Sequence, residues 1–353
     1  MKIHHIPYKE TGYFSNLITD YLDKNDQLTP FYGNFPDLNG FKNQIELKES
    51  FSTQKRKTLV EALKNQYNST KISDTTKHNI HLLESENTFT ITTGHQLNIF
   101  TGPLYFLYKI VSTINLTKQL KKEFPTCNFV PVYWMATEDH DFEEINYFNF
   151  NGQKVLWNRA SSGAVGRLDT AGLNHVFEKF SQQLGNTINA NFIKDLFEKS
   201  YVEHDNLTDA TRYLVNELFG EYGLVILDGD DKKLKEQFVP TVKDELLNKT
   251  SFNHVSATSE RLGEQYKIQV NPRGINLFYL KDNLRERIVF ENNMFKVNNT
   301  LAVFSENEIL DEVSNFPERF SPNVIMRPLY QETILPNLCY IGGGGELAYW
   351  FQL

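Results

Sequence analysis

The fold is decided by the stretch from Thr88 to Glu144. It begins TFTITTGHQLNIFTGPLYFLYKI (88–110) and closes with NFVPVYWMATEDHDFEEI (128–145). Each segment opens with the β-branched and aromatic residues that are typical of strands. Between the two, apolar residues recur at the spacing of a helix with one buried face, namely Leu107, Ile110, Val111 and Ile114. Strand, helix and strand in this order predict a βαβ unit with two parallel strands.

A polar cluster follows each of these two strands. Gly94-His95-Gln96 ends the first, and Glu138-Asp139-His140-Asp141 ends the second. In a βαβ unit both clusters lie at the carboxyl ends of parallel strands, which is where open α/β sheets bind their ligands. A third buried strand, Leu224–Leu227, ends in Asp228-Gly229-Asp230-Asp231. We interpret these three aspartates as a solvated turn rather than as a ribose or metal site.

The remaining sequence predicts an α/β protein whose Rossmann-type parallel-sheet core carries an inserted, smaller β-rich and helical subdomain. Residues 1–87 are expected to form a helical cover, and 88–250 the core with helical insertions. Short strand patterns such as YKIQV (266–270), NLFYL and RERIVF place a β-rich connecting subdomain at 251–304. Residues 305–353 are expected to return to the core. The last residues read as a helix without an end signal, so we expect a truncated chain.

Composition and charge exclude several classes of protein. The chain has 353 residues, of which 40% are hydrophobic, enough for a sizeable core. The formal net charge of −8 counts against nucleic-acid and anionic-membrane binding. Two cysteines, Cys127 and Cys339, do not make a disulfide framework. Neither a signal peptide nor a membrane span is apparent, so we expect a soluble, cytoplasmic protein.

The first cluster suggests phosphate chemistry. Gly94 permits close approach of a ligand to the backbone, and the start of the next helix favours anions. The imidazole of His95 can donate a hydrogen bond to a developing negative charge on a phosphoryl group. The alternative is a histidine that only caps or packs the turn.

The second cluster has three possible roles. Glu138, Asp139 and Asp141, around His140, can hold a substrate ammonium group, act as a general base or bind Mg²⁺. A zinc site needs further ligands that the sequence does not supply, so we assign no metal to the protein itself.

Two motifs near the end of the chain complete the candidate site. Gly342, Gly343, Gly344 and Gly345 permit either an unusual backbone path or a phosphate cradle, but no Walker Gly-Lys-Ser/Thr follows. Arg327 and Gln331 stand upstream, and an arginine there can grip a carboxylate or phosphate bidentately. The alternative for Arg327 is a structural ion pair.

Taken together, these motifs resemble the bacillithiol biosynthesis cysteine-adding enzymes, the BshC family. The resemblance covers nearly the whole chain. The strongest matches are TGHQLNIFTGPLYFLYKI, VPVYWMATEDHDFEEIN, SPNVIMRPLYQETILPN and YIGGGGELAYWFQL, and the weaker ones are YGLVILDGDD and IQVNPRGINLFYL.

The resemblance implies a fold and an activity. The core would be similar to class I aminoacyl-tRNA synthetases and nucleotidylyltransferases, and a C-terminal helical, coiled-coil region beyond this chain would form a homodimer. The reaction would be the ligase step that joins L-cysteine to the glucosamine amine of glucosaminyl malate, giving the low-molecular-weight thiol bacillithiol. Amide formation would use ATP, and Mg²⁺ is a possible companion.

The resemblance also implies roles for residues. Catalysis would fall to His95, Asp139 and His140, with Asp139 and His140 orienting cysteine or the amine. Substrate would be bound by Gln96, Asn98, Thr101, Glu138, Arg327 and Gln331. Nucleotide or ligand would meet the backbone at Gly94 and at Gly342, Gly343, Gly344 and Gly345.

Three questions stay open on sequence alone. The activated intermediate is either an adenylate or an acyl phosphate. Another nucleotidylyltransferase or amino-acid-activating enzyme of the same fold is an alternative. The third possibility is a non-catalytic ligand-binding protein on a Rossmann-type core.

Overall fold

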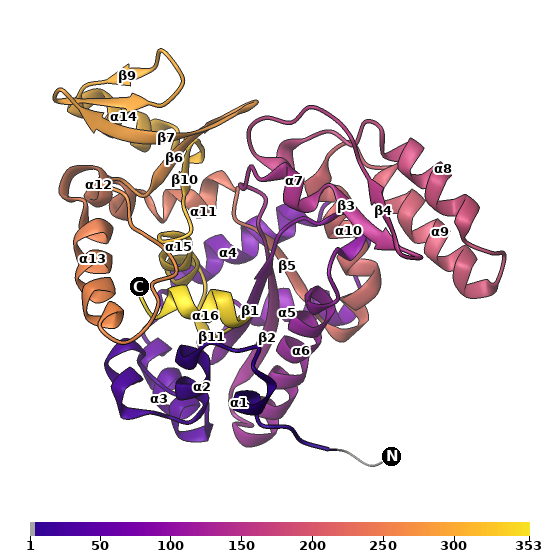
Figure 1. The fold of residues 1–353 in the computed structure, drawn as a ribbon, viewed down its shortest axis with the longest axis horizontal. Helices are drawn as coiled ribbons and strands as arrows, with labels where there is room; N and C mark the ends of the chain where they lie inside the picture. Colours follow the sequence, from indigo (N-terminus) through magenta and orange to yellow (C-terminus); the bar gives the residue numbers. More distant parts are fainter. Residues whose placement is uncertain (1–3) are drawn as a thin grey trace.

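The computed structural model describes residues 4–353, and its centre is a four-stranded parallel sheet (Figure 1). The strands lie in the order β11-β1-β2-β5. Their bounds are Asn337–Ile341 for β11, Thr88–His95 for β1, Asn128–Met135 for β2 and Val225–Asp228 for β5. The predicted Rossmann-type α/β fold is therefore confirmed.

Helix α6 (Tyr105–Glu123) is the predicted crossover between β1 and β2. Its buried stripe, which includes Phe106, Ile110 and Ile114, packs against the sheet, and every residue of β1 is buried. Strands covered on both faces read as continuous apolar runs, which explains the pattern of β2. The chain runs from β1 to β2 and β5 on one side, and returns with β11 on the other. The strand order therefore reverses at β1.

The N-terminal residues form helices, as their polar and periodic sequence predicts. They comprise α1 (Tyr8–Thr11), α2 (Asn16–Leu22), the 3₁₀ turn η1 (Asp26–Phe31), α3 (Leu38–Lys48), α4 (Thr53–Gln66) and α5 (Asp74–Leu82). Ser52 and Ser73 start α4 and α5, because their side chains accept hydrogen bonds from the backbone N–H groups of Lys55 and Thr76. Helices α4 and α5 pack against β5, and α5 also contacts β2.

A helical insertion follows β2. It contains α7 (Phe142–Ile145), the hairpin β3 (Tyr147–Phe150) and β4 (Gln153–Leu156), and the 3₁₀ turn η3 (Val165–Arg167). Three helices complete it: α8 (Leu173–Gln183), α9 (Ile188–Tyr201) and α10 (Leu207–Phe219), followed by η4 (Gly220–Tyr222). The hairpin and α8 and α9 enclose a cluster of phenylalanine rings, including Phe148, Phe180 and Phe197.

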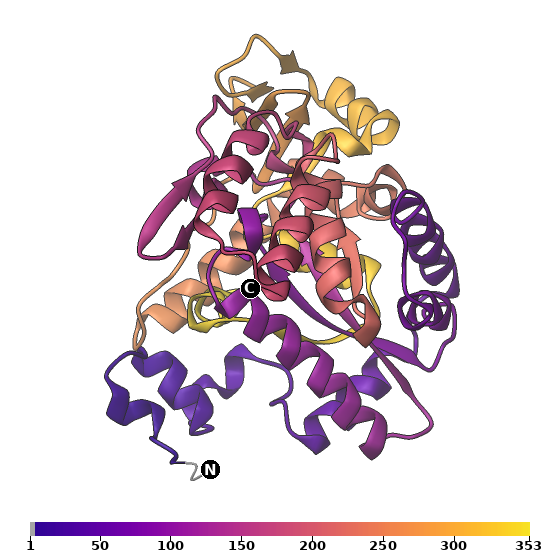
Figure 2. The same ribbon diagram turned by 90° about the vertical axis from the view of Figure 1, so that its right-hand side faces the viewer.

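After β5 come α11 (Lys232–Glu236), α12 (Val239–Asn248) and α13 (Thr250–Gly263), and then a five-stranded antiparallel sheet in the order β10-β6-β7-β8-β9. Its strands are β6 (Leu277–Lys281), β7 (Leu284–Glu291), β8 (Met294–Val297), β9 (Val303–Phe304) and β10 (Phe320–Pro322), with α14 (Glu306–Asn315) and η5 (Pro317–Arg319) between β9 and β10. This sheet and helices α1–α3 lie at opposite ends of the molecule, whereas α4 and α5 lie beside the central sheet (Figures 1 and 2).

The predicted strand at YKIQV is wrong, because residues 264–276 form a connection without regular structure. The side-chain amide of Gln352 takes the backbone groups that a neighbouring strand would bind. Its Oε1 accepts from the N–H groups of Gln269 and Val270 at 2.8 and 3.0 Å, and its Nε2 donates to the carbonyl of Val270 at 2.7 Å.

The last helix packs against one of the first helices. Helix α15 (Arg327–Ile334) leads into β11, and α16 (Gly344–Trp350) then packs on α2. A small apolar cluster joins the start, middle and end of the chain through Leu17, Ile18, Leu262, Ala348 and Phe351. Of the helices that the structure describes, none is long and apolar enough to cross a membrane.

Candidate active site

The carboxyl ends of β1 and β2 open into a cleft of about 900 Å³. One wall is the parallel core, and the facing wall is the segment 269–278 together with strand β7 of the antiparallel sheet. The polar side chains that line it include those of His95, Gln96, Lys109, Glu138, Asp139, His140, Arg273, Arg285, Arg287, Arg327 and Glu346. The cleft lies where the strand order reverses, which is the usual ligand site of such sheets.

His95 lies at the end of β1 and is 8% exposed. Its Nδ1 is 3.0 Å from the carbonyl oxygen of Gln96, and its ring packs against those of Tyr105 and Phe106. Burial lowers the pKa of His95 to about 4, so the ring is neutral at pH 7. Because a carbonyl only accepts, the proton of the neutral ring is on Nδ1. The buried Nε2, which has no partner among the described residues, is therefore a hydrogen-bond acceptor.

Asp139 is the centre of the second cluster. It accepts hydrogen bonds from Gln96 Nε2 and, at 2.7 Å, from the backbone N–H of His140. Arg285, from β7, places its Nη1 3.4 Å from Asp139 Oδ1 and 2.5 Å from His140 Nδ1. Although burial opposes ionisation, the hydrogen bonds of His140 and Gln96 and the charge of Arg285 hold the pKa of Asp139 well below its usual range. A carboxylate of this kind is a poor proton acceptor and a good partner for a cation.

The predicted solvated turn after β5 is wrong, because Asp228 and Asp230 belong to a buried charge network. Lys235 Nζ, on α11, lies 3.0 Å from Asp230 and 2.6 Å from Glu138. Arg167 adds a second cation 2.7 Å from Asp230, whose side chain is only 7% exposed. Burial and the charge of Asp230 raise the pKa of Asp228 to about 6. Asp231 caps α11.

Arg327 enters the cleft from the start of α15. Its guanidinium lies over the rings of Tyr340 and Trp134, and its Nη1 donates to Gln331 Oε1 at 3.0 Å. Within the described residues its Nη2 is buried without a partner and no carboxylate forms an ion pair with it, so the structural ion pair is the wrong interpretation. Gln331 is fully buried behind Arg327 and does not line the cleft.

Two predicted substrate residues do not reach the cleft. Asn98 Nδ2 donates to the carbonyl of Glu144 at 2.9 Å, and Thr101 has a φ of 69° in the turn η2 (Ile99–Thr101). Both residues shape the connection between β1 and α6. At Gly102 a Cβ would lie 2.4 Å from Asn98 Cβ, which explains why a glycine ends this turn.

The glycine run joins β11 to α16. None of Gly342–Gly345 has a positive φ, so the predicted unusual backbone path is wrong, whereas the cradle stays a prediction. The backbone N–H of Gly343 is already bound, because it donates to Glu346 Oε2 at 2.8 Å. Gly94 is needed for packing, since a Cβ there would lie 2.9 Å from the hydroxyl of Tyr340.

Sequence reasoning missed a charged network at the strand-order reversal. Lys109 Nζ donates to the carbonyl of Gly94 and, at 2.7 Å, to Glu346 Oε2. Glu346 Oε1 accepts from the hydroxyl of Tyr340 at 2.6 Å. A signal was present, because Lys109 occupies the buried stripe of α6, three residues after Phe106 and four before Thr113. A lysine in such a stripe needs a partner.

Comparison with known proteins agrees with this geometry. A family model described as "Bacillithiol biosynthesis BshC, N-terminal Rossmann-like domain" matches residues 1–353. The chain belongs to this family. The predicted resemblance is confirmed, and the cleft is a feature of a BshC Rossmann-like domain.

Relatives from several bacteria carry the name "Putative cysteine ligase BshC". The chain is 62% identical to that of Flavobacterium johnsoniae over 349 residues and 56% identical to that of Christiangramia forsetii over 354 residues. In both cases the match covers 99% of this chain and 66% of the relative. The relative from Shouchella clausii is 30% identical over 361 residues. The chain thus spans 66% of the length of the relatives from Flavobacterium and Christiangramia.

The BshC domain brings three metal-ligating side chains together at Asp139, His140 and Asp141, whose ligand atoms lie within 4.8 Å of one another. The guanidinium of Arg285 already contacts two of these three side chains, at Asp139 Oδ1 and at His140 Nδ1. A fixed cation at this distance opposes a metal ion there.

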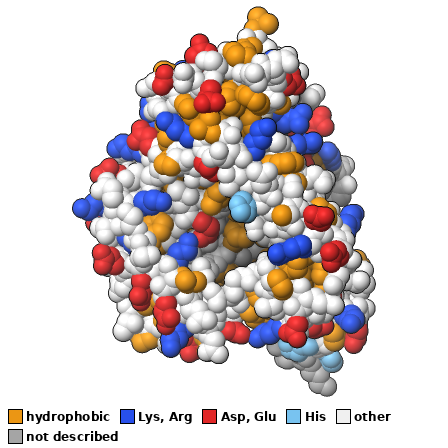
Figure 3. Space-filling model, turned by 90° about the vertical axis from the view of Figure 1, so that its left-hand side faces the viewer, with side chains coloured by type: hydrophobic (Ala, Val, Ile, Leu, Met, Phe, Trp, Pro, Cys, Tyr) orange, Lys and Arg blue, Asp and Glu red, His pale blue; other side chains and the backbone are white. Residues whose placement is uncertain are grey.

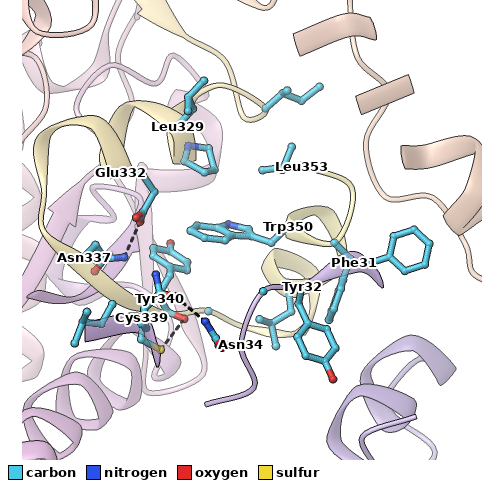
Figure 4. Close-up of a pocket in the computed structure, with 18 of the residues that line it drawn as sticks. Phe31, Tyr32, Asn34, Leu329, Glu332, Asn337, Cys339, Tyr340, Trp350 and Leu353 are labelled. Carbon is cyan, nitrogen blue, oxygen red and sulfur yellow. Dashed lines mark hydrogen bonds between the residues drawn. The ribbon is translucent and has the colours of Figure 1, made fainter. Parts of the chain in front are cut away.

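The BshC domain has a second cavity, of about 820 Å³, on the face that carries α3 and α13 (Figure 3). Figure 4 shows the ring of Trp350 beside that of Tyr340, with Phe31 and Tyr32 across the space. The stacked rings of Trp350 and Tyr340 are 4.7 Å apart. Among the described residues that line this cavity there is no lysine or arginine, whereas Glu332, Asp244 and Glu245 are present. Anionic ligands are therefore better matched to the first cleft.

Proposed function

We propose that the cleft is the active site of a ligase that uses ATP to join L-cysteine to the glucosamine amine of glucosaminyl malate. The relatives' name and the family description support a cysteine ligase of bacillithiol biosynthesis. One structural observation carries the proposal. A neutral His95 with a free Nε2 and an Arg327 with an unpartnered Nη2 share one cleft with the ionised Asp139.

The first step would activate the cysteine carboxylate. Its oxygen attacks a phosphorus of ATP, giving either an adenylate and pyrophosphate or an acyl phosphate and ADP. Arg327 would hold the carboxylate or the phosphoryl oxygens through its free Nη2. His95 would take up a proton on Nε2 as the phosphates bind, because a nearby anion raises a histidine pKa, and would then donate to a phosphoryl oxygen. Mg²⁺ would enter with the nucleotide.

The second step would form the carbon–nitrogen bond. The glucosamine nitrogen attacks the activated carbonyl carbon, loses a proton, and releases AMP or phosphate. Asp139 would hold an ammonium group of cysteine or of the acceptor, since its carboxylate stays ionised. Its low pKa favours this binding role over that of a general base.

The test is mass spectrometry of an incubation with ATP, Mg²⁺, L-cysteine and glucosaminyl malate, run on this chain and on a version extended to the length of the relatives. Bacillithiol from both would place the whole site within residues 1–353. Product from the extended chain alone would show that the additional region is required. Release of AMP and pyrophosphate would identify the adenylate, and release of ADP the acyl phosphate.

No product from either version would contradict the proposal. A screen of amino acids for pyrophosphate exchange into ATP would then detect an amino-acid-activating enzyme with another substrate. Light scattering of the same two samples tests the expected homodimer.

A further inference from the structure

Five acids and five lysines or arginines line the cleft, but they are not all paired with one another. Three of its carboxylates each lie beside a cation: Glu138 has Lys235 at 2.6 Å, shared with Asp230, Asp139 has Arg285 at 3.4 Å, and Glu346 has Lys109 at 2.7 Å. Two further acids face the cleft. Glu286 accepts from the side-chain amide of Asn299, and the half-exposed Asp141 lies 3.9 Å from His140 Nε2.

Two arginines on the wall opposite the core have no such partner. In the part of the chain that the structure describes, the guanidinium groups of Arg273 and Arg287 make no hydrogen bond and no ion pair, yet both residues line the cleft. With Arg327, they leave three guanidinium groups without a carboxylate around one cavity. An anionic ligand with more than one negative group would satisfy this arrangement.

The backbone holds both arginines in place. Arg287 is two residues after Arg285 on β7, so the two share a face of the strand. Its cross-strand neighbour is Phe278, whose ring lies 4.0 Å from the Arg285 guanidinium and 5.5 Å from the ring of His140. Arg287 therefore lies on the same strand face as Arg285, which contacts the Asp139–His140 cluster.

Arg273 is fixed through the fully buried Asn276. The backbone N–H of Arg273 donates to Asn276 Oδ1 at 3.0 Å, and Asn276 Nδ2 donates back to the carbonyl of Arg273 at 2.8 Å. Asn276 is itself bound to Glu245, Ser251 and Asn323. The backbone is therefore anchored while the guanidinium stays free for a ligand.

We propose that Arg273 and Arg287 bind the two carboxylates of the acceptor and so determine its specificity; this inference rests on the proposed function. A guanidinium pairs with a carboxylate through two parallel hydrogen bonds. With its dicarboxylate end on this wall, the acceptor presents its amine toward Asp139 and His140. His95 and Arg327, on the core wall, remain available for the activated cysteine.

The test is calorimetry with two probes, glucosaminyl malate and methyl glucosaminide, which lacks both carboxylates. Arg273→Gln and Arg287→Gln should each lower the affinity for glucosaminyl malate about ten-fold or more and leave the affinity for methyl glucosaminide unchanged. Arg261→Gln is the matched control, because this exposed arginine of α13 lies outside the cleft, over the ring of Phe31. Thermal unfolding of each variant checks that it is folded.

Three results would overturn the inference. Equal losses for the two probes would mean that the arginines only maintain the wall. The proposed binding site would also be rejected if both arginine variants bound glucosaminyl malate as tightly as the unaltered protein, or if the unaltered protein did not bind it at all.

The measurement is separable from the ligase activity. Selective binding without any product would reject the proposed ligation alone. Product formed by variants with an unchanged KM for the acceptor would reject only the role of the two arginines.

Discussion

His95 shows how burial of a single ring makes stability depend on pH. Its pKa of about 4 lies below the ordinary value, so the unfolded chain binds a proton more readily between pH 6.5 and 4. The stabilisation is complete above pH 6.5 and is lost as the pH falls toward 4. We expect the unaltered protein to lose about 2 kcal/mol more than His95→Gln between pH 7 and 4.5.

Urea unfolding at both pH values measures this difference. The control is His175→Gln, because His175 is an exposed residue of α8 whose side chain is 73% accessible. That variant should follow the unaltered protein. Equal pH dependence in His95→Gln and the unaltered protein would contradict the neutral, buried state of His95.

For single residues, the sequence predicts where a side chain lies better than it predicts its protonation state or its partners. A strand pattern followed by Gly-His-Gln was enough to predict that His95 lies at the carboxyl end of a parallel strand. Its tautomer could not be predicted, because it depends on the rotation of one carbonyl, that of Gln96. Asp230 was wrongly predicted to lie in a solvated turn for a similar reason. Two of its partners, Arg167 and Lys235, come from separate elements, and their charges make a buried aspartate possible.

Among the elements, α6 and α16 are joined by one partly buried ion pair. Lys109→Met should lower the free energy of unfolding by about 3 kcal/mol, because it leaves the partly buried carboxylate of Glu346 without a cation. Only the hydroxyl of Tyr340 and the backbone N–H of Gly343 would still donate to it. Lys109→Met combined with Glu346→Gln should recover part of that loss, since no unpaired charge remains. Urea unfolding of the two single variants and the double variant measures the coupling. Strictly additive losses would show that the two side chains act independently.

The join between α4 and β1 depends on a fully buried arginine that sequence analysis did not identify. Arg56 donates to the carbonyls of Leu83, Glu86 and Thr88, the residues through which the chain enters β1. We expect Arg56→Met to destabilise the fold by about 3 kcal/mol, because three carbonyls lose a charged donor. Arg56→Lys should be nearly as destabilising, since one ammonium group cannot reproduce the planar arrangement of donors in a guanidinium.

Denaturation curves of these variants test the role of Arg56. Lys57→Met is the matched control, because the neighbouring Lys57 is exposed. It should change the free energy of unfolding by less than about 0.5 kcal/mol. An Arg56→Lys variant as stable as the original would show that charge alone is required.

The elements themselves were largely predictable where their signals are local. Strands β1, β2 and β5 and helix α6 follow from alternation, apolar runs and helical spacing. The contacts between distant elements were not predictable. Nothing near Asp139 indicates that Arg285, from the other sheet, will lie against it. For the same reason residues 266–270 were predicted as a strand, although their backbone groups are bound by Gln352, more than 80 residues away.

Considered as a whole, the molecule closes its sheet and its cleft with the same final segment. Strand β11 pairs with β1, and Glu346, six residues after its Tyr340, binds Lys109 at the floor of the cleft. The last turn then reaches the facing wall, because Gln352 binds the segment that leads to Arg273. The C-terminal residues therefore connect the core wall to the wall that carries the unpaired arginines.

Gln352→Met should loosen that wall without disturbing the core. The side chain keeps its size but loses its four hydrogen bonds, to the N–H groups of Gln269 and Val270, the carbonyl of Val270 and the hydroxyl of Ser259. We expect a loss of about 2 kcal/mol in unfolding free energy, because partly buried backbone groups lose their hydrogen-bond partner. Hydrogen exchange at the amides of Gln269 and Val270 should quicken about ten-fold or more, while that of Val132 in β2 follows only the global loss. Gln183→Met, on the exposed end of α8, should change neither quantity. If the two amides kept their protection, the segment would be held by its own packing, and the link between the C-terminal turn and the arginine wall would be rejected.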